Sequence, residues 1–210
     1  MKKFKILIPV YNDWQSLSTL LNNIDNEIKN LDHEFSIIVI DDASTFHRHL
    51  NIKNLLNIKS IKILSMKENK GHARCIAAGL KYIFEKEEFD YVIPMDGDGE
   101  DRPEEIKEFV KSVENVPEQT VVGIRVKRSE AFVFKFCYFF HKIITLVFTG
   151  HSIKYGNFTC LTKHTVEKLL NEKATWNSFS GALTKVEKNK ISIPSIRGER
   201  YFGPSKMSFN

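Results

Sequence analysis

The stretch VIPMDGDGEDRPEEI, residues 92–106, decides the fold, because an apolar run ends in it abruptly and a cluster of acids follows. The acids are Asp96, Asp98, Glu100 and Asp101. The apolar run is typical of a buried strand, so the acids lie where a strand leaves the core. Two interpretations compete: the acids simply begin a solvated helix, or Asp96 and Asp98 hold a divalent cation over a phosphate.

On either side of this stretch, short β-rich runs alternate with helical patterns. Apolar residues recur at helical spacing in residues 16–31 and again from about residue 71. The expected strands are residues 4–9, 35–40, 60–64, 91–95 and 120–124. Uninterrupted apolar strands separated by helices predict an α/β fold, with a mostly parallel, Rossmann-like central sheet and helices on both faces.

The 210 residues contain no internal repeat, low-complexity tract or linker, so we expect one domain covering residues 1–210. The sequence ends on SKMSFN, without a helix stop or a polar tail. This leaves open a native chain that continues into a membrane segment.

Polar residues follow three of the expected strands. The first strand leads into Pro9, Tyr11 and Asp13, the second into Asp42, and the fourth into Asp96. Ligands of such sheets bind at the carboxyl ends of the strands, where the strand order reverses. Singly, each exit has a structural explanation, because Asp13 could cap a helix and Asp42 could make a turn. Together, three polar exits on one edge favour a binding site.

The acidic cluster divides into two roles. A single glycine, Gly97, separates Asp96 from Asp98, so both carboxylates can face one ion. We predict that they bind Mg²⁺ or Mn²⁺ together with substrate phosphates, and Glu100 could complete the coordination. The next four residues, Asp-Arg-Pro-Glu from position 101, predict a capping box with proline in the first turn. We therefore assign Asp101 to the start of a helix.

Three more residues are candidates for nucleotide binding. Tyr11 could stack on a base, although a core aromatic is the more common role of such a side chain. Asp42 could accept hydrogen bonds from a base or a ribose. Lys70 precedes a glycine at an expected helix start, where backbone N–H groups favour a phosphate. The fingerprint GxGxxG is absent, which argues against a Rossmann dehydrogenase.

Composition and charge narrow the setting. The net charge of +5 suits anionic partners, without selecting among nucleotides, nucleic acid and phospholipid surfaces. The three cysteines are widely spaced and form no CxxC pair, which argues against a disulfide framework or a zinc site and favours the cytoplasm. No stretch reaches 18 uncharged apolar residues, so we expect no transmembrane span within residues 1–210.

The motifs IPVYND, VIDDAST, NKGHARCIAAGL, MDGDGED and RYFGPSK occur in this order over nearly the whole sequence. In these motifs the sequence resembles the family 2 glycosyltransferases, which have the GT-A fold. Its last motif resembles the subgroup that glycosylates a polyprenyl phosphate. The resemblance implies an inverting hexosyltransferase with a nucleotide diphosphate sugar of the UDP or GDP type as donor and a polyprenyl phosphate as acceptor. We expect no nucleic-acid partner.

The resemblance also assigns roles to single residues. In the family, the positions of Tyr11 and Asp42 lie around the nucleotide base. The positions of Asp96 and Asp98 lie around the diphosphate and the metal, and the position of Glu100 sometimes coordinates the metal.

In the family, positively charged residues lie near the donor and acceptor phosphates. Their positions correspond to Arg125, Arg128 and Lys206 in this sequence. The expected catalytic residues are Asp98, Arg125, Lys206 and Asn157. The expected donor-binding residues are Pro9, Tyr11, Asp13, Asp42, Lys70, Asp96, Gly97, Arg128 and Arg200.

The sequence departs from the family at two places. GNFTCL, residues 156–161, stands where the family has a stretch like GDFRL, so that Asn157 and Thr159 replace an acid and an arginine. A hydroxyl acceptor must lose a proton, whereas a phosphate monoester, with a second pKa of about 6, arrives ionised. Asn157 is therefore tolerable for a phosphate acceptor. Transfer to a saccharide hydroxyl and an inactive nucleotide-sugar-binding module remain alternatives. Ala43 in DDAS, where the family has glycine, is a minor change.

Residues 131–148, AFVFKFCYFFHKIITLVF, are apolar almost all round. Lys135, Tyr138, Lys142 and Thr145 form one polar stripe at helical spacing. This pattern predicts an amphipathic helix in a membrane interface, with a core or partner helix as the alternative. We therefore expect a peripheral protein at the cytoplasmic face of a membrane.

Overall fold

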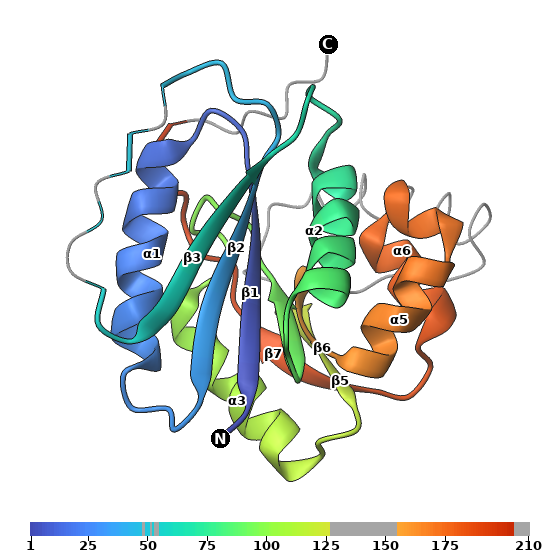
Figure 1. The fold of residues 1–210 in the computed structure, drawn as a ribbon. Helices are drawn as coiled ribbons and strands as arrows, with labels where there is room; N and C mark the ends of the chain where they lie inside the picture. The colour runs from blue at the N-terminus through green and yellow to red at the C-terminus, as the bar shows by residue number, and fades with distance from the viewer. Residues whose placement is uncertain (48, 51, 53–54, 127–154, 204–210) are drawn as a thin grey trace, which may run out of the picture.

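The structure is a computed structural model that describes residues 1–47, 49–50, 52, 55–126 and 155–203. These residues form a seven-stranded sheet with helices on both faces (Figure 1). The strands are β1 (Lys3–Val10), β2 (Glu34–Asp41), β3 (Ile58–Ser65), β4 (Tyr91–Pro94), β5 (Thr120–Arg125), β6 (Tyr155–Thr162) and β7 (Lys190–Ser195). The helices are α1 (Trp14–Ile28), α2 (His72–Lys86), α3 (Ile106–Asn115), α5 (Lys163–Asn171) and α6 (Phe179–Val186), with 3₁₀ turns at Pro103–Glu105 and Lys173–Trp176.

The strand order is β3-β2-β1-β4-β6-β5-β7. β1 pairs in parallel with β2 and with β4, and β2 pairs in parallel with β3. β6 runs antiparallel to β4 and β5, whereas β5 and β7 are parallel. The chain moves outward from β1 to β3 and then adds β4 on the other side of β1. The strand order therefore reverses between β1 and β4, which is where open α/β sheets bind their ligands.

Two apolar layers cover the sheet. α1 and α3 lie on one face, and α2, α5 and α6 lie on the other (Figure 1). Leu17 and Leu21 of α1 pack in the first layer with Phe109 of α3, and Ile76 and Leu80 of α2 pack in the second. β1 and β2 are buried from their second residue to their last. Burial on both faces explains why these two strands are uninterrupted apolar runs in the sequence.

The predicted fold class, an α/β fold with a mostly parallel sheet covered on both faces, is confirmed. The five predicted strands form as β1 to β5, and the two helical patterns form as α1 and α2. β6, α5, α6 and β7 were not predicted. β7 is an edge strand with alternating half-buried and exposed residues and contains Pro194, so it lacks the continuous apolar signal of the central strands.

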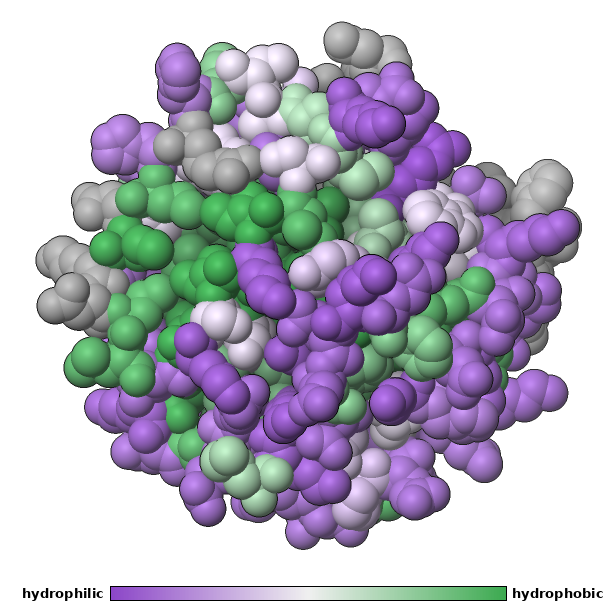
Figure 2. Space-filling model, in the orientation of Figure 1, coloured by the Kyte–Doolittle hydropathy of each residue, from purple (hydrophilic) through white to green (hydrophobic). Residues whose placement is uncertain are grey.

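Figure 2 shows apolar surface gathered over β3 and the connection that leads into it. Phe46, Ile52 and Leu56 of this connection are exposed. Among the described residues, no helix is long and apolar enough to cross a membrane. The aromatic stretch 131–148 lies outside the described residues, so its predicted interface helix stays a prediction.

Candidate active site

The exits of β1 and β4 lie side by side at the switch point. A Cβ atom added to Gly97 would lie 3.1 Å from the carbonyl oxygen of Pro9 and 3.3 Å from Cγ2 of Ile8. Such distances are tighter than ordinary side-chain contacts, so glycine permits this approach of the two loops. Pro9 and Gly97 thus bring the acids that follow β4 next to those that follow β1.

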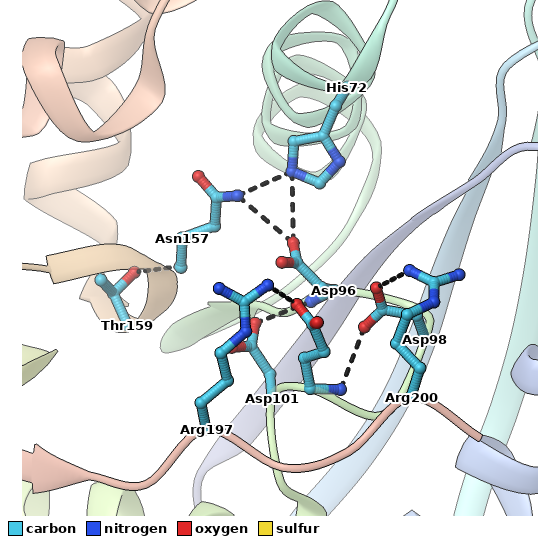
Figure 3. A network of polar contacts seen from close by, with 9 residues as sticks. His72, Asp96, Asp98, Asp101, Asn157, Thr159, Arg197 and Arg200 are labelled. Atoms are coloured by element: carbon cyan, nitrogen blue, oxygen red, sulfur yellow. Dashed lines mark hydrogen bonds and ion pairs between the residues drawn. The ribbon is translucent and has the colours of Figure 1, made fainter. Parts of the chain in front are cut away.

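Arg200 joins these two exits from a distant part of the sequence. Its Nη2 lies 3.0 Å from Oδ2 of Asp13. Its Nη1 lies 2.5 Å from Oδ2 of Asp98 (Figure 3). Asp13 precedes α1, but its side chain makes no capping hydrogen bond. The alternative that Asp13 caps the helix is therefore wrong. Its carboxylate pairs with Arg200 instead.

Residues 196–201, which we call the C-terminal clasp, hold the acidic loop by its backbone. The N–H of Gly198 donates to the carbonyl oxygen of Glu100 at 2.8 Å, and the N–H of Tyr201 donates to that of Asp98 at 2.9 Å. Gly99 has a φ of 93°, and a Cβ there would lie 2.6 Å from the ring of Tyr201. The acidic loop and the clasp therefore form one packed unit.

Asp101 does not cap a helix. Its Oδ2 accepts a hydrogen bond from the backbone N–H of Asp96 at 2.8 Å, and the side chain is buried. The 3₁₀ turn that precedes α3 begins after Arg102 without a side-chain cap. The predicted capping box is wrong, because the short acidic loop turns the carboxyl of Asp101 inward. Its role is still structural, since it holds the turn that carries Asp96.

Burial raises the pKa values of two of these carboxyls, those of Asp98 and Asp101. Burial raises the pKa of Asp98, and the charges of Asp96 and Glu100 add to the effect against the opposing charge of Arg200. Burial and the neighbouring Asp96 raise the pKa of Asp101 to about 8, against the opposing charge of Arg125. At neutral pH the buried Asp101 therefore tends to keep its proton, and the loop carries less negative charge than its sequence suggests.

Asp96 faces the other side of the cleft and meets Asn157 and His72. Nδ2 of Asn157, on β6, lies 3.3 Å from Oδ1 of Asp96 and 2.7 Å from Nε2 of His72, the first residue of α2 (Figure 3). The same Nε2 lies 3.3 Å from Oδ1 of Asp96. The structure thus places Asn157 beside Asp96, and its catalytic assignment stays a prediction.

The predicted base-binding residues lie at the exits of β1 and β2. The side chain of Tyr11 is 40% exposed, so it is available for stacking and is not a core aromatic. Asp42 is buried, and its two carboxylate oxygens accept the backbone N–H groups of Lys70 and Gly71 at 2.7 and 2.8 Å. The side chain of Lys70 pairs with Glu68. In this structure Asp42 therefore fixes the loop that enters α2.

The basic residues are only partly described. Arg125 ends β5, and its guanidinium lies against β6, where a Cβ on Gly156 would be 3.1 Å from its Nη2. Arg197 forms an ion pair with Glu100. Arg128 and Lys206 lie outside the described residues, so their assignments stay predictions.

The carboxylates that follow β4 suit a hard cation that takes its remaining ligands from a substrate. Asp96 and Asp98 offer carboxylate oxygens, and Mg²⁺ typically takes one or two carboxylates together with substrate phosphates. In the part of the chain that the structure describes, no three acidic, histidine or cysteine side chains are grouped to hold a metal on their own. The carboxylate of Glu100 is directed to Arg197 instead. A cation would therefore compete with Arg200 for Asp98 and would need the substrate for its remaining ligands.

A cavity of about 660 Å³ lies near this edge, on the side of α1. Its described lining contains no arginine or lysine and includes Asn12, Gln15, Phe46, His49 and Phe202. A diphosphate needs cationic partners, so the cluster around Asp98 and Arg200 is the better candidate site than this cavity.

Two features of the site escaped prediction. His72 lies within the quoted motif NKGHARCIAAGL but carries no signal by itself, because its partners are 24 and 85 positions away in the sequence. The inward turn of Asp101 was hidden by a local pattern that also fits a helix start. A histidine directly after the glycine that begins a helix is the one clue that could have drawn attention to the first feature.

Solved structures with the same fold are glycosyltransferases of the GT-A type. TarS 1–349 from S. aureus, in complex with UDP-GlcNAc, matches with a TM-score of 0.61 at 16% identity, over 96% of this chain and 60% of that chain. The mannosyltransferase PcManGT from Pyrobaculum calidifontis, in complex with GDP-Man and Mn²⁺, matches with a TM-score of 0.59 at 17% identity, over 93% of this chain and 56% of that chain. At such identities the likeness establishes the fold.

The sequence matches the profile of glycosyl transferase family 2 over residues 5–177, and the chain belongs to this family. The undecaprenyl-phosphate 4-deoxy-4-formamido-L-arabinose transferase of Serratia proteamaculans is 30% identical over 229 residues, which cover 99% of this chain and 64% of the relative. The enzyme of the same name from Proteus mirabilis is 28% identical over 223 residues, which cover 100% of this chain and 64% of the relative. The chain thus spans about 64% of the length of these curated relatives. The predicted family and fold are confirmed.

Proposed function

We propose that the chain transfers a sugar from a nucleotide diphosphate sugar to a polyprenyl phosphate, with inversion. The observation that carries the proposal is the juxtaposition of Asp96, Asp98 and Arg200 at the switch point of a family 2 glycosyltransferase fold. The relatives named above act on undecaprenyl phosphate, which supports the acceptor. Structural neighbours bound to UDP-GlcNAc and to GDP-Man with Mn²⁺ support the donor class and a divalent metal.

On the donor side, Asp96 and Asp98 would hold Mg²⁺ or Mn²⁺, which supplies positive charge for the departing diphosphate. Arg200 is already tied to Asp98 and Asp13, and its buried Nε has no hydrogen-bond partner among the described residues. A guanidinium with an unused donor suits a phosphate oxygen. We assign Arg200 to the diphosphate and the exposed ring of Tyr11 to the base.

On the acceptor side, a phosphate oxygen attacks the anomeric carbon from the face opposite the leaving group. The bond from that carbon to the diphosphate oxygen breaks, and the nucleoside diphosphate departs with the electron pair. The acceptor phosphate is largely a dianion at neutral pH, so no side chain has to remove a proton. Arg125 and Arg128, together with Lys206, are assigned to orient the phosphates.

We further propose that residues 131–148 bring the chain to the cytoplasmic face of a membrane, where a polyprenyl phosphate presents its head group. The purified chain should co-sediment with anionic liposomes and be released by salt. Serine at positions 139 and 140, in place of Phe139 and Phe140, should weaken this binding. If the unmodified chain stays in the supernatant, the membrane assignment of this stretch is wrong.

The experiment that tests the function supplies the chain with radiolabelled UDP-sugars and GDP-sugars, a short polyprenyl phosphate in detergent, and either Mn²⁺ or EDTA. The expected product extracts into organic solvent, and its formation stops with EDTA. A parallel reaction offers soluble saccharides as acceptors. Robust transfer to a saccharide hydroxyl, with none to polyprenyl phosphate, would overturn the proposed acceptor. Nucleotide binding without any transfer would favour the inactive-module alternative, which Asn157 suggests.

A further inference from the structure

Arg200 ties the acid that follows β1 to the acids that follow β4. Its guanidinium donates to Asp13 through Nη2 and to Asp98 through Nη1. An arginine side chain keeps its charge in proteins and can only donate, so the direction of both contacts is fixed. The side chains of Arg200 and Asp98 are each 18% exposed. Solvent therefore screens this charge cluster only weakly.

Both carboxylate oxygens of Asp98 already have partners. Oδ1 accepts the backbone N–H of Glu100 at 3.0 Å, and Oδ2 accepts the hydrogen bond from Arg200. A divalent cation on this carboxylate would lie close to the guanidinium, and the two positive charges would repel each other. Arg200 therefore opposes the binding of a cation to Asp98 for as long as the two side chains are paired.

The backbone around Arg200 is fixed, so a change of partner falls on its side chain. The backbone N–H groups of Gly198 and Tyr201 are bonded to the acidic loop, and the hydroxyl of Tyr201 accepts a hydrogen bond from Asn23 at 2.9 Å. The guanidinium has a second anchor in Asp13, and its buried Nε has no hydrogen-bond partner among the described residues. It can thus exchange one partner while it keeps the other.

Building on the proposed function, we propose that Arg200 is a switch that couples the binding of the metal to the binding of the donor. Paired with Asp98, it keeps a divalent cation off the acidic pair. The diphosphate of a donor offers oxygens that match the planar fork of the guanidinium, and Arg200 leaves Asp98 for them. The carboxylate of Asp98 then becomes available to the cation. Such a coupling is reciprocal, so the cation also strengthens the binding of the donor.

Two simpler roles of Arg200 have different signatures. If Arg200 only contacted the donor, its loss would weaken nucleotide binding and leave the binding of Mn²⁺ by itself unchanged. If it only held the C-terminal clasp against the acidic loop, its loss would weaken both. The switch alone predicts opposite signs: weaker binding of the nucleotide and tighter binding of Mn²⁺ by itself.

The calorimetric arm titrates Mn²⁺ alone, and UDP or GDP in the presence of Mn²⁺, into the unmodified chain and its variants. We expect Arg200→Gln to bind Mn²⁺ alone about tenfold more tightly and the nucleotide about tenfold more weakly, as is typical of coupled sites. Arg200→Lys keeps the positive charge, so its affinity for Mn²⁺ alone should stay near that of the unmodified chain. A gain in Mn²⁺ affinity that is absent from Arg200→Gln, or equally large in Arg200→Lys, would overturn the inference.

Arg102→Gln is the matched control. It removes the same charge from the same loop, and the side chain of Arg102 pairs with Glu104 at 3.5 Å. Both affinities should stay unchanged in this variant. Tighter Mn²⁺ binding by Arg102→Gln as well would show that the net charge of the loop, and no switch at Arg200, sets the affinity.

The spectroscopic arm uses the unmodified chain and so does not depend on the folding of a variant. In the ¹⁵N spectrum, the Nε–H signal of Arg200, identified by its loss in Arg200→Lys, should stay in place on addition of Mg²⁺. It should shift when UDP or GDP is added with Mg²⁺. A shift with Mg²⁺ alone, or none with the nucleotide, overturns the inference. Transfer to polyprenyl phosphate with either of these spectra removes the switch and leaves the proposed function, whereas the expected spectra without transfer count against the proposed function alone.

Discussion

Four acids that are wholly or partly withdrawn from solvent form two pairs with opposite electrostatics. In the acidic loop after β4, burial and neighbouring carboxylates raise the pKa values of Asp98 and Asp101. In the scaffold, Asp25 on α1 is buried and Glu87 after α2 is partly buried, yet their pKa values are lowered. Burial opposes ionisation in all four, so the difference comes from their partners.

The scaffold acids have partners that favour their charged form. Asp25 accepts backbone N–H groups from Leu56, Asn57 and Ile58 at 2.8–3.2 Å, which together outweigh its burial. Glu87 likewise pairs with two lysines. Asp98 and Asp101 each accept one backbone N–H group, but they also face neighbouring carboxylates. Within the described residues one arginine, Arg200, pairs with Asp98. Strained electrostatics of this kind mark functional sites, because a cationic partner that binds later relieves them.

The largest effect that sharpens this contrast is expected for Asp98→Asn. The change removes a carboxylate that we assign to the metal, and we expect transfer to fall roughly a thousandfold, about 4 kcal/mol in activation free energy. Because the buried charge is unfavourable in the unbound chain, we expect the free energy of unfolding to stay unchanged or to rise. Turnover assays and urea unfolding measure the two quantities.

Asp101→Asn is the matched control for Asp98→Asn. It makes the same chemical change three positions further on, where we assign no metal contact, so Mn²⁺-dependent nucleotide binding should persist. Isothermal titration of GDP and UDP with and without Mn²⁺ compares the two variants. If both lose the metal-dependent binding equally, the division of the acidic loop into metal ligands and structural acids is wrong.

The second effect concerns the pH dependence of stability. The pKa of Asp101 is about 8 in the folded chain, against an ordinary value of 3.8 in the unfolded chain, so between these values the folded state binds the extra proton. Its contribution to stability is therefore complete below about pH 4 and is lost as the pH rises toward 8. The asparagine that replaces Asp101 in the variant cannot ionise. The unfolding free energy of Asp101→Asn minus that of the unmodified chain should thus increase with pH in this window, by up to ~1.4 kcal/mol per pH unit.

Urea titrations at pH 5, 6, 7 and 8 test this expectation, with the unmodified chain beside the variant. A difference that is flat over these four values would mean that Asp101 ionises as readily in the folded chain as in the unfolded one. The acids of the loop would then not differ from the scaffold acids in the direction of their pKa shifts.

The same contrast explains what could be predicted from the sequence. β1 and β2 are buried on both faces, so burial leaves a continuous apolar pattern that any reader of the sequence can find. The strand exits follow directly from these patterns, which is why Asp13 and Asp96 were identified as site candidates. Most residues of β7 are half-buried or exposed, so its sequence has no continuous apolar pattern.

Contacts between distant residues could not be predicted in this way. Arg200 and Asp13 are 187 positions apart, and His72 and Asn157 are 85 positions apart. No local periodicity encodes such pairs, because they depend on how the sheet and the C-terminal clasp pack. The capping box at Asp101 failed for a different reason: the loop is buried and turns Asp101 toward the nearby Asp96, and the local pattern does not encode this burial.

The third effect tests the scaffold side of the comparison. Asp25→Ala leaves the N–H groups of Leu56, Asn57 and Ile58 without their acceptor, and we expect a loss of about 2–3 kcal/mol in unfolding free energy at pH 7. Because the pKa of Asp25 is lowered, its contribution is present above the unfolded value of 3.8 and is lost as the pH falls through the folded value. The variant and the unmodified chain should therefore approach each other in urea titrations at pH 3.

Asp32→Ala provides the control, since Asp32 is exposed and its loss should change stability by less than about 0.5 kcal/mol. Equal effects of the two substitutions would show that the backbone contacts of Asp25 contribute nothing. The scaffold acids would then not differ from surface acids.

The smallest effect lies in the backbone of the functional edge. Ala43, directly after Asp42 at the exit of β2, has a φ of 57°, in the left-handed region that costs an alanine roughly 1–2 kcal/mol. Ala43→Gly removes this strain. It also increases the conformational entropy of the unfolded chain, which lowers the free energy of unfolding by about 0.4–1 kcal/mol. We expect a net gain of about 0.5–1 kcal/mol in urea unfolding, while Ala78→Gly inside α2 should lose about 1 kcal/mol. A gain in stability with unchanged transfer would show that the strain is incidental. A gain with lower transfer would show that the alanine helps to set the Asp42 loop, and a loss would mean that the methyl group packs usefully enough to outweigh its strain.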